Sequence, residues 1–295
     1  MRLVADLGGT NLRFGVVPGG QVLPDRVATF RNDDFTGFMP ALEHYWTGIG
    51  HPDVSEAVIA VAGPVSGSRA RLTNRDWQVD AAGIAKTLGG ATVMLMNDLG
   101  ALGHAVPHLG AGDVATIAAH AVAPAGSRQA LVIGIGTGFN VSPVLMAGDT
   151  VLTPAAEYGH TPLPALIADR LRADFPKLAA MATVEDCFSG RGFARMQDAW
   201  HRRRASDGDP SGFRGHIAEL LGHLARDLFL TFLPNSGIYF AGSVARAILQ
   251  PPAQPRFAKV FTQPFPLSDD LGAPVHLILN DDAALRGCAA VPPAG

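Results

Sequence analysis

Two neighbouring polar residues, Asn97-Asp98, could take part in proton transfer. They directly follow the apolar run 91–96, and there an aspartate can act as a general base while an asparagine holds the substrate. The same dipeptide also suits the start of a helix, because Asp and Asn lead the preference for the N-cap position. The residues alone leave both interpretations open.

A second polar group, Glu157-Tyr-Gly-His160, is joined by Glu185. A carboxylate and an imidazole three positions apart can hold vicinal hydroxyl groups, because one accepts hydrogen bonds and the other donates or accepts them. The pair could also form half of a metal site. Neither a cysteine cluster nor a second histidine pair follows at ligand spacing, so zinc is not expected. Glu185 stands at the expected start of a helix, where helix capping is the stronger interpretation.

Two glycine-rich segments suit phosphate binding. Asp6-Leu-Gly-Gly-Thr-Asn11 lies between apolar runs, which predicts a β-hairpin with a polar tip, and Gly134-Ile-Gly-Thr-Gly138 repeats the pattern. Glycines admit a ligand to backbone N–H groups, Thr and Asn can donate to phosphate oxygens, and Asp6 can hold Mg²⁺ through water. An ordinary surface hairpin, with its glycines at positive φ, is the alternative for the first tip. The repetition indicates two similar halves whose tips could close on one polyphosphate.

The remaining sequence supplies the elements that must position these groups. The expected strands are residues 3–7, 12–17, 21–30, 56–62, 91–96, 130–133, 139–146, 150–152, 238–241 and 275–279. The expected helices are residues 35–46, 80–88, 99–107, 163–175, 184–188, 193–200, 213–232, 283–290 and one beginning at 244. Strands followed by strand–helix alternation, twice over, predict an α/β protein of two related domains around a central cleft.

Three details of this assignment can be checked separately. The run 91–96 is apolar apart from Thr92, which predicts a buried strand in a parallel part of the sheet. Asp33 or Asp34 is the expected N-cap of the helix 35–46. The passage between the two halves is expected between Gly110–Gly112 and the Ala/Pro/Gly/Ser-rich run Ala121–Ser127.

Composition narrows the function classes. The 295 residues are 47% hydrophobic and 17% charged with a net charge of −3, which predicts a globular protein without attraction to nucleic acid. The single basic cluster, His201–Arg204, lacks interleaved aromatic residues and is expected to be a solvated helix end. The two cysteines stand far apart, no apolar run reaches membrane-spanning length, and no signal-peptide pattern occurs. We therefore expect a cytoplasmic protein without membrane partners.

Several motifs together resemble bacterial glucokinases of the actin/hexokinase-like superfamily, over nearly the whole chain. In order they are Asp6-Leu-Gly-Gly-Thr-Asn11, Leu72-Thr-Asn-Arg-Asp-Trp77, Asn97-Asp98, Gly134-Ile-Gly-Thr-Gly138, Glu157-x-Gly-His160, Glu185 and Ala241-Gly242. The resemblance implies two ribonuclease-H-like domains, a smaller one of residues 1–108 with 281–295 and a larger one of residues 109–280. It also implies ATP-dependent phosphorylation of glucose at its 6-hydroxyl, with Mg²⁺, and a homodimer.

The resemblance also assigns roles. Asp98 would be the general base, within a sugar-binding set of Asn97, Asp98, Glu157, His160 and Glu185. Asp6 would hold Mg²⁺ through water. Nucleotide contacts would come from Asp6 with Gly8, Gly9, Thr10 and Asn11, from Gly134, Gly136, Thr137 and Gly138, and, at the adenosine, from Gly242. The sequence departs from the family pattern at three positions where glycine is usual: Tyr158, Asn140 and Ser243.

Three other functions compete with this assignment. A kinase of the same fold for fructose, mannose or an N-acetylated hexose is the nearest, because one hydroxyl contact can decide specificity. A non-catalytic sugar sensor is disfavoured because Asp6, Asp98 and both glycine segments are present. A dinucleotide-dependent dehydrogenase would need G-x-G-x-x-G opening a helix, whereas Gly134-Ile-Gly-Thr-Gly138 precedes a strand-like run.

Overall fold

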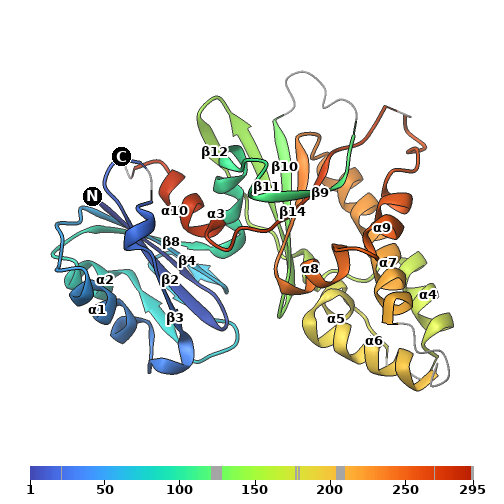
Figure 1. Ribbon diagram of the computed structural model, residues 1–295, viewed down its shortest axis with the longest axis horizontal. Coiled ribbons are helices and arrows are strands. Elements are labelled where there is room, and N and C mark those ends of the chain that lie inside the picture. Colours follow the sequence, from blue (N-terminus) through green and yellow to red (C-terminus); the bar gives the residue numbers. More distant parts are fainter. Residues whose placement is uncertain are drawn as a thin grey trace. The chain divides into compact units, whose positions relative to one another are not determined.

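The computed structural model describes residues 1–20, 22–120, 128–176, 178, 180–203, 210–268 and 270–293, and they form two compact units. The first unit consists of Met1–Leu109, Gly148–Thr153 and Asn280–Gly295; the second consists of Gly110–Ala147 and Pro154–Leu279. Figure 1 draws the start of the chain in blue and the returning C-terminal helix in red. The domain bounds 1–108 with 281–295 and 109–280 stay a prediction, and the run 121–127 lies outside the described residues.

A five-stranded sheet forms the centre of the first unit. Its strands are β1 (Arg2–Leu7), β2 (Asn11–Val17), β3 (Ala28–Arg31), β4 (Glu56–Val61) and β8 (Thr92–Asn97). They lie in the order β3-β2-β1-β4-β8, in which β1, β4 and β8 run parallel to one another and β2 is antiparallel to both of its neighbours, β1 and β3. The predicted hairpin of β1 and β2 is confirmed. Because the three parallel strands end at the same edge, residues that follow them are brought together.

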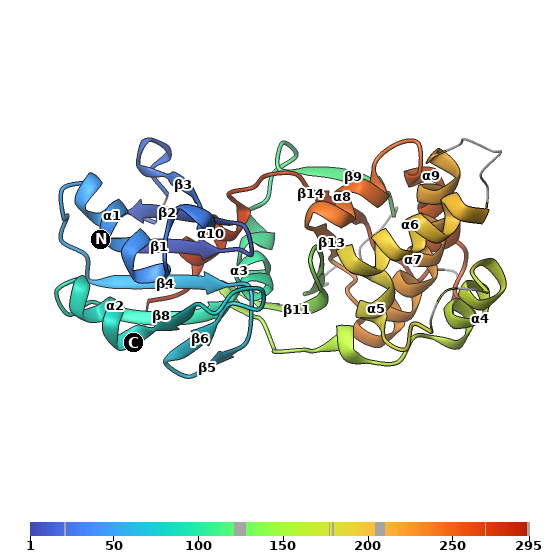
Figure 2. The same cartoon turned by 90° about the horizontal axis from the view of Figure 1, so that it is seen from below.

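Helices cover both faces of this sheet (Figure 1). They are α1 (Phe38–Gly48), α2 (Ala81–Thr87), α3 (Asp98–Ala105) and α10 (Ala283–Ala290). Alternate strand residues point to opposite faces, so Leu3 and Ala5 join the apolar cluster of α1 and α2, whereas Val4 joins that of α3 and α10. A small antiparallel sheet of β5 (Val65–Ser66), β6 (Arg69–Arg71) and β7 (Gln78–Asp80) follows β4 (Figure 2). The segment 148–153 adds β12 (Thr150–Leu152) to this unit.

The second unit repeats the plan of a hairpin followed by parallel strands. Its strands lie in the order β11-β10-β13-β14-β9. They are β9 (Val114–Ala118), β10 (Gln129–Ile135), β11 (Phe139–Ala147), β13 (Gly237–Ala241) and β14 (Val275–Ile278). Its helices are α4 (Ala165–Asp174), α5 (Val184–Phe188), α6 (Gly190–Arg203), α7 (Pro210–Phe232), α8 (Ser243–Leu249) and α9 (Gln254–Phe261). The helix expected at residues 213–232 is confirmed as α7, and its Ile217, Leu221 and Leu228 are fully buried.

Three expectations about local structure are wrong. The strand expected at 21–30 shortens to Ala28–Arg31, because Pro24 lacks an N–H and begins a 3-10 turn; Gln21 lies outside the described residues. The helix α1 begins after Gly37, while Asp33 and Asp34 belong to a separate 3-10 turn. The strand β8 does run parallel to β4, but it is the edge strand of its sheet and mostly unburied, with Met94 37% exposed.

Other elements were not expected from the sequence. The short strands β5, β6, β7 and β9 and the helix α9 have no glycine-bounded apolar run or long helical stripe to mark them. Among the residues that the structure describes, no helix combines the length and apolar character needed to cross a membrane.

Candidate functional site

The polar residues of the first unit gather where its parallel strands end. In the register of the sheet, Asp6 of β1 lies level with Ala60 of β4, and Ala60 lies level with Met96 of β8. Asn97 and Asp98, which follow Met96, therefore stand at the same edge as Asp6 and the first glycine tip. This is the edge at which sheets of this kind bind ligands.

Asn97 and Asp98 both serve the helix α3, as the capping interpretation expects. Asn97 is the N-cap, and its Oδ1 accepts a hydrogen bond from the backbone N–H of Leu99 at 3.0 Å. Its Nδ2 donates to the carbonyl oxygen of Gly63 at 3.3 Å. The Asp98 Oδ1 accepts from the same Leu99 N–H, also at 3.0 Å. Because Asn97 already caps the helix, capping alone does not require a carboxylate at position 98.

The Asp98 carboxyl group is hard to ionise in this environment. Burial raises its pKa from 3.8 to about 7, and the negative charge of Asp6 raises it as well. The backbone N–H groups of Leu99 and Asp98 act in the opposite direction by binding the ionised form. A carboxyl group with a pKa near neutrality suits a general base, because it can both accept and release a proton at working pH.

Asp6 is buried but has a cationic partner. Its Oδ2 lies 3.5 Å from Nη1 of Arg13, the residue directly opposite it in the β1–β2 hairpin. Burial raises the pKa of Asp6 to about 6, although Arg13 lowers it and the nearby Asp281 and Asp282 raise it slightly. The guanidinium of Arg13 also lies within 4.0 Å of both of these aspartates, just before α10. Arg13 was not singled out from the sequence, although its place opposite Asp6 in the predicted hairpin could have indicated it.

The first glycine tip spans Gly8 to Asn11. The Gly8 N–H donates to the carbonyl oxygen of Asn11 at 3.0 Å, which closes the turn. Neither Gly8 nor Gly9 takes a positive φ, so the conformational reason expected for a hairpin turn does not apply here. What glycine does provide at these positions is a backbone without side chains in front of it.

The second glycine tip, between β10 and β11, is attached to the helices that follow it. The Gly136 N–H donates to Gly138 O at 3.0 Å, and the Gly190 N–H donates to Gly136 O at 2.8 Å. The Glu185 Oε2 accepts a hydrogen bond at 3.1 Å from the backbone N–H of Phe139, directly after the tip. A Cβ on Gly138 would lie only 2.7 Å from that carboxylate oxygen.

Glu185 is not the capping residue of its helix. The cap of α5 is a capping box in which the Thr183 side chain accepts from the Asp186 N–H and the Asp186 carboxylate accepts from the Thr183 N–H. The Glu185 carboxylate instead lies against the second glycine tip, partly exposed. The capping interpretation of Glu185 is therefore wrong, and its side chain remains available for a ligand near the tip.

Glu157 and His160 are exposed; Glu157 directly precedes a 3-10 turn, Tyr158–His160, and His160 is the last residue of that turn. The Glu157 Oε2 accepts from Nδ2 of Asn140 at 3.1 Å. Asn140 also donates to Ala156 O at 2.8 Å and accepts from the Tyr158 N–H at 3.0 Å. Asn140 therefore holds the whole segment beside β11, a role that the sequence did not reveal. Among the described residues, no group of three His, Cys, Asp or Glu side chains could hold a metal ion.

Gly242 lies where two strands of the second unit end close together. It has a φ of +99°, and a Cβ there would lie 2.4 Å from the carbonyl oxygen of Ile135. Ser243 begins the helix α8 directly after it. Gly242 is thus a glycine that backbone geometry requires, next to the end of the strand that leads into the second tip.

A sequence model of the glucokinase family matches residues 3–211 and 215–293. The chain belongs to this family. Glucokinases from Saccharophagus degradans and Aromatoleum aromaticum are similar to it at 29% and 30% identity, over 98% of this chain and 97% and 93% of the respective relatives. The glucokinase assignment made from the motifs is confirmed.

Solved structures agree on the fold. A glucokinase from an Antarctic psychrotroph has a TM-score of 0.78 at 24% identity, covering 98% of this chain and 97% of that one. A ROK family glucokinase from Streptomyces griseus, in complex with glucose and AMPPNP, has a TM-score of 0.65 at 21% identity, with 98% and 97% covered. The predicted fold class, an α/β fold of the actin/hexokinase type, is confirmed.

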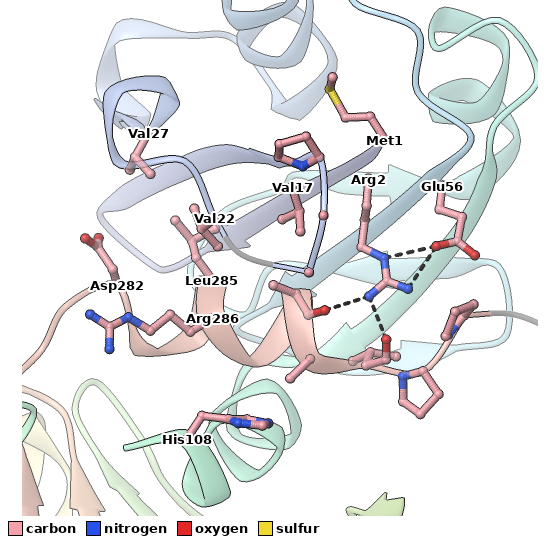
Figure 3. Close-up of a pocket in the computed structure, with 18 of the residues that line it drawn as sticks. Met1, Arg2, Val17, Val22, Val27, Glu56, His108, Asp282, Leu285 and Arg286 are labelled. Atoms are coloured by element: carbon pink, nitrogen blue, oxygen red, sulfur yellow. Dashed lines mark hydrogen bonds and ion pairs between the residues drawn. The ribbon is translucent and has the colours of Figure 1, made fainter. Parts of the chain in front are cut away.

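A separate pocket of this glucokinase-family chain lies at the opposite edge of the first sheet (Figure 3). It has a volume of about 1030 Å³, and its lining includes Arg2, Glu56, Leu285 and Arg286 but neither Asp6 nor Asp98. Arg2 binds Glu56 at 2.8 Å and donates to the carbonyl oxygens of Ala289 and Val291 at the end of α10. These contacts tie the returning helix to the start of β1, so we assign the residues a structural role rather than a part in the reaction.

The predicted site residues thus fall into two groups. The first unit brings together Asp6, Asn97, Asp98 and the tip of residues 8–11 at one sheet edge. The second unit brings Glu185 to the tip of residues 134–138, and holds Glu157 and Gly242 near the same strands.

Proposed function

We propose that this chain transfers the γ-phosphoryl group of ATP to the 6-hydroxyl of glucose, with Asp98 as the general base. The observation that carries the proposal is the position and pKa of the Asp98 carboxyl group. It stands at the carboxyl edge of parallel strands, beside Asp6, with a pKa raised to about 7. Membership of the glucokinase family and the presence of a carboxyl group suited to general-base catalysis together favour a hexose kinase over a binding protein.

In the proposed reaction, the ionised Asp98 takes the proton of the sugar 6-hydroxyl. The hydroxyl oxygen attacks the γ-phosphorus of ATP, and the bond between this phosphorus and the ADP oxygen breaks. Asn97, Glu157, His160 and Glu185 hold the other hydroxyl groups. Correct positioning of two reactants can supply about 7–11 kcal/mol of the barrier reduction, so these residues contribute to rate as well as to affinity. The N–H groups of the two glycine tips that are not used within the turns bind the phosphate oxygens.

The residues of the first unit fit Mg²⁺ carried by the nucleotide. This ion usually keeps several waters and takes only one or two carboxylates together with substrate phosphates. Asp6 is a buried carboxylate beside the first glycine tip, and it would hold the ion through water. The ion, when bound, neutralises charge on the phosphate oxygens. Arg13 keeps the Asp6 carboxylate oriented at the strand end.

A coupled assay of ADP release tests the proposal. Glucose, fructose, mannose and N-acetylglucosamine are compared as acceptors, and ATP and polyphosphate as donors. We expect ATP with glucose to give the highest kcat/KM. A clear preference for another hexose would move the assignment to a kinase of the same fold, and sugar binding without sugar-dependent ADP release would indicate a sensor.

We further propose that the protein acts in the cytoplasm as a homodimer, without nucleic-acid or membrane partners. The family resemblance supports the dimer, and the net charge of −3 supports the absence of nucleic-acid binding. Sedimentation equilibrium over a range of protein concentrations tests the dimer. A single species with the mass of one chain, 30.8 kDa, would refute it.

A further inference from the structure

The segment Leu72–Trp77 has no role in the reaction proposed above, yet it is fixed beside the first glycine tip. Its ends are joined by a hydrogen bond from the Leu72 N–H to Trp77 O at 3.0 Å. The backbone N–H and the hydroxyl of Thr73 both donate to Ala62 O, at 3.2 and 3.1 Å, just beyond the end of β4. The turn is therefore anchored at the sheet edge that carries Asp6.

Three successive carbonyl oxygens of the first glycine tip are bound by two residues outside it. Gly8 O accepts from Nδ2 of Asn32 at 2.9 Å, and Thr10 O accepts from the backbone N–H of Asn32, also at 2.9 Å. Between them, Gly9 O accepts from Nε of Arg75 at 3.4 Å. Asn32 and Arg75 thus bind three successive carbonyl groups of the tip.

This arrangement fixes the direction of the N–H groups of the tip. In a trans peptide unit the C=O and the N–H point in opposite directions. The N–H groups of Gly9 and Thr10 share their peptide units with the carbonyl groups of Gly8 and Gly9. Because those carbonyl groups are directed toward Asn32 and Arg75, the two N–H groups are directed away from them, as a phosphate-binding loop requires.

Arg75 and Asn32, which bind the tip, are themselves fixed in the structure. The Arg75 guanidinium forms an ion pair with Asp33, whose pKa it lowers, and lies 5.9 Å from the centre of the Trp77 ring. Asn32 is fully buried, and its Oδ1 has no hydrogen-bond partner among the described residues. A buried amide whose oxygen has no hydrogen-bond partner destabilises the folded protein. Leucine at position 32 would therefore give a more stable protein, unless the NH₂ group of Asn32 were needed. Its hydrogen bond to Gly8 O supplies that need.

We propose that Arg75 and Asn32 are positioning residues that hold the first glycine tip in the conformation that binds nucleotide phosphates. The inference rests on the proposed function for the identity of the ligand. It predicts a selective loss: when the tip relaxes, binding of the nucleotide triphosphate weakens, whereas glucose, which is held by other residues, still binds.

The test compares Arg75→Met with Arg71→Met as the matched control. Arg71 belongs to the same region, but its side chain is exposed and, within the part of the chain that the structure describes, pairs with the exposed Asp76, at 3.6 Å. We expect Arg75→Met to raise the KM for ATP at least tenfold, with the KM for glucose within twofold and the melting temperature unchanged. Calorimetric titration with AMPPNP should show the same tenfold loss without turnover. The single amine of Arg75→Lys can bind only one of the two partners, Gly9 O or Asp33, so its KM for ATP should lie between those of the wild type and Arg75→Met. The KM of Arg71→Met should match that of the wild type.

Two results would overturn the inference. One is a folded Arg75→Met protein that binds AMPPNP as tightly as the wild type. The other is an equal loss of AMPPNP and glucose affinity together with a lower melting temperature, which would indicate a general structural role. If the wild type binds AMPPNP but phosphorylates no hexose, only the proposed function fails. If the wild type binds no AMPPNP, both proposals are refuted.

Discussion

Replacing Asp98 by Asn should make the enzyme much slower and, above neutral pH, more stable. The amide cannot accept the hydroxyl proton, so turnover should fall at least ~10²-fold. Its Oδ1 can still accept from the Leu99 N–H, as the carboxylate does at 3.0 Å, and Asn97 accepts from that N–H too. We therefore expect the helix start and the affinity for glucose to change little.

The gain in stability follows from the raised pKa. Because Asp98 titrates at about 7 in the folded protein and ordinarily at 3.8, the folded state binds the proton more tightly and loses stability as pH rises between these values. At about 1.4 kcal/mol per pH unit, the resulting loss in the free energy of unfolding reaches at most about 4 kcal/mol above pH 7. The residue is partly exposed, so about 2–4 kcal/mol is the expected range. Asn does not titrate, and the variant escapes this loss.

Urea denaturation at pH 5 and pH 8 measures the effect. The advantage of Asp98→Asn over the wild type should grow by about 2–3 kcal/mol between the two pH values. Asp76→Asn is the control, because the Asp76 side chain is 89% exposed and should show no such growth. An Asp98→Asn protein with turnover within tenfold of the wild type, or without extra stability at pH 8, would refute the role and the environment assigned to Asp98.

Four further outcomes are expected. The kcat/KM of the wild type should fall about tenfold per pH unit below about pH 7, since protonated Asp98 cannot act as a base; a flat profile from pH 5.5 to 8 would contradict this. Glu185→Gln should raise the KM for glucose about tenfold with little change in melting temperature, because an amide oxygen can still accept from the Phe139 N–H. Gly159→Ala should destabilise the protein by more than about 3 kcal/mol in urea denaturation, because its Cβ would lie 2.0 Å from Phe139 O. Arg2→Ala should lower stability by about 2–3 kcal/mol in the same assay, since it leaves Glu56 and the end of α10 unpaired; unchanged unfolding would show that these contacts contribute little.

The meeting of Asp6 and Asp98 at one edge of the sheet could be predicted from the sequence, because it depends only on which segments form parallel strands. Asp6 lies near the end of one apolar run and Asp98 follows another, and the parallel strands that these runs form end at one edge of the sheet. Their meeting thus required only correct strand assignment. The pKa of Asp98 could not be predicted in this way, because it depends on burial and on its separation from Asp6 in space.

Residues that support a site without contacting the substrate leave no comparable pattern in the sequence. Asn32 reaches the first glycine tip from a 3-10 turn that the sequence suggested was a helix cap, and Arg75 reaches it across 66 residues of chain. Asn140 stood out only as a departure from the family pattern, yet it makes hydrogen bonds to three residues of the following segment. Such contacts depend on side-chain geometry between distant segments, which periodicity does not encode.

The glycines of the second unit show why a glycine count alone could not identify the phosphate loop. Gly159 and Gly242 are surrounded by backbone, with Cβ positions 2.0 and 2.4 Å from carbonyl oxygens, so close packing explains them whether or not a ligand binds. Gly136 differs: its N–H and C=O are both held by hydrogen bonds, yet no described atom lies within 4 Å of where its Cβ would stand. Neither packing nor a positive φ requires glycine at this position. What glycine provides here is open space at the backbone, and because the Gly136 N–H already donates to Gly138 O, we expect a phosphate to bind through other donors of the second tip.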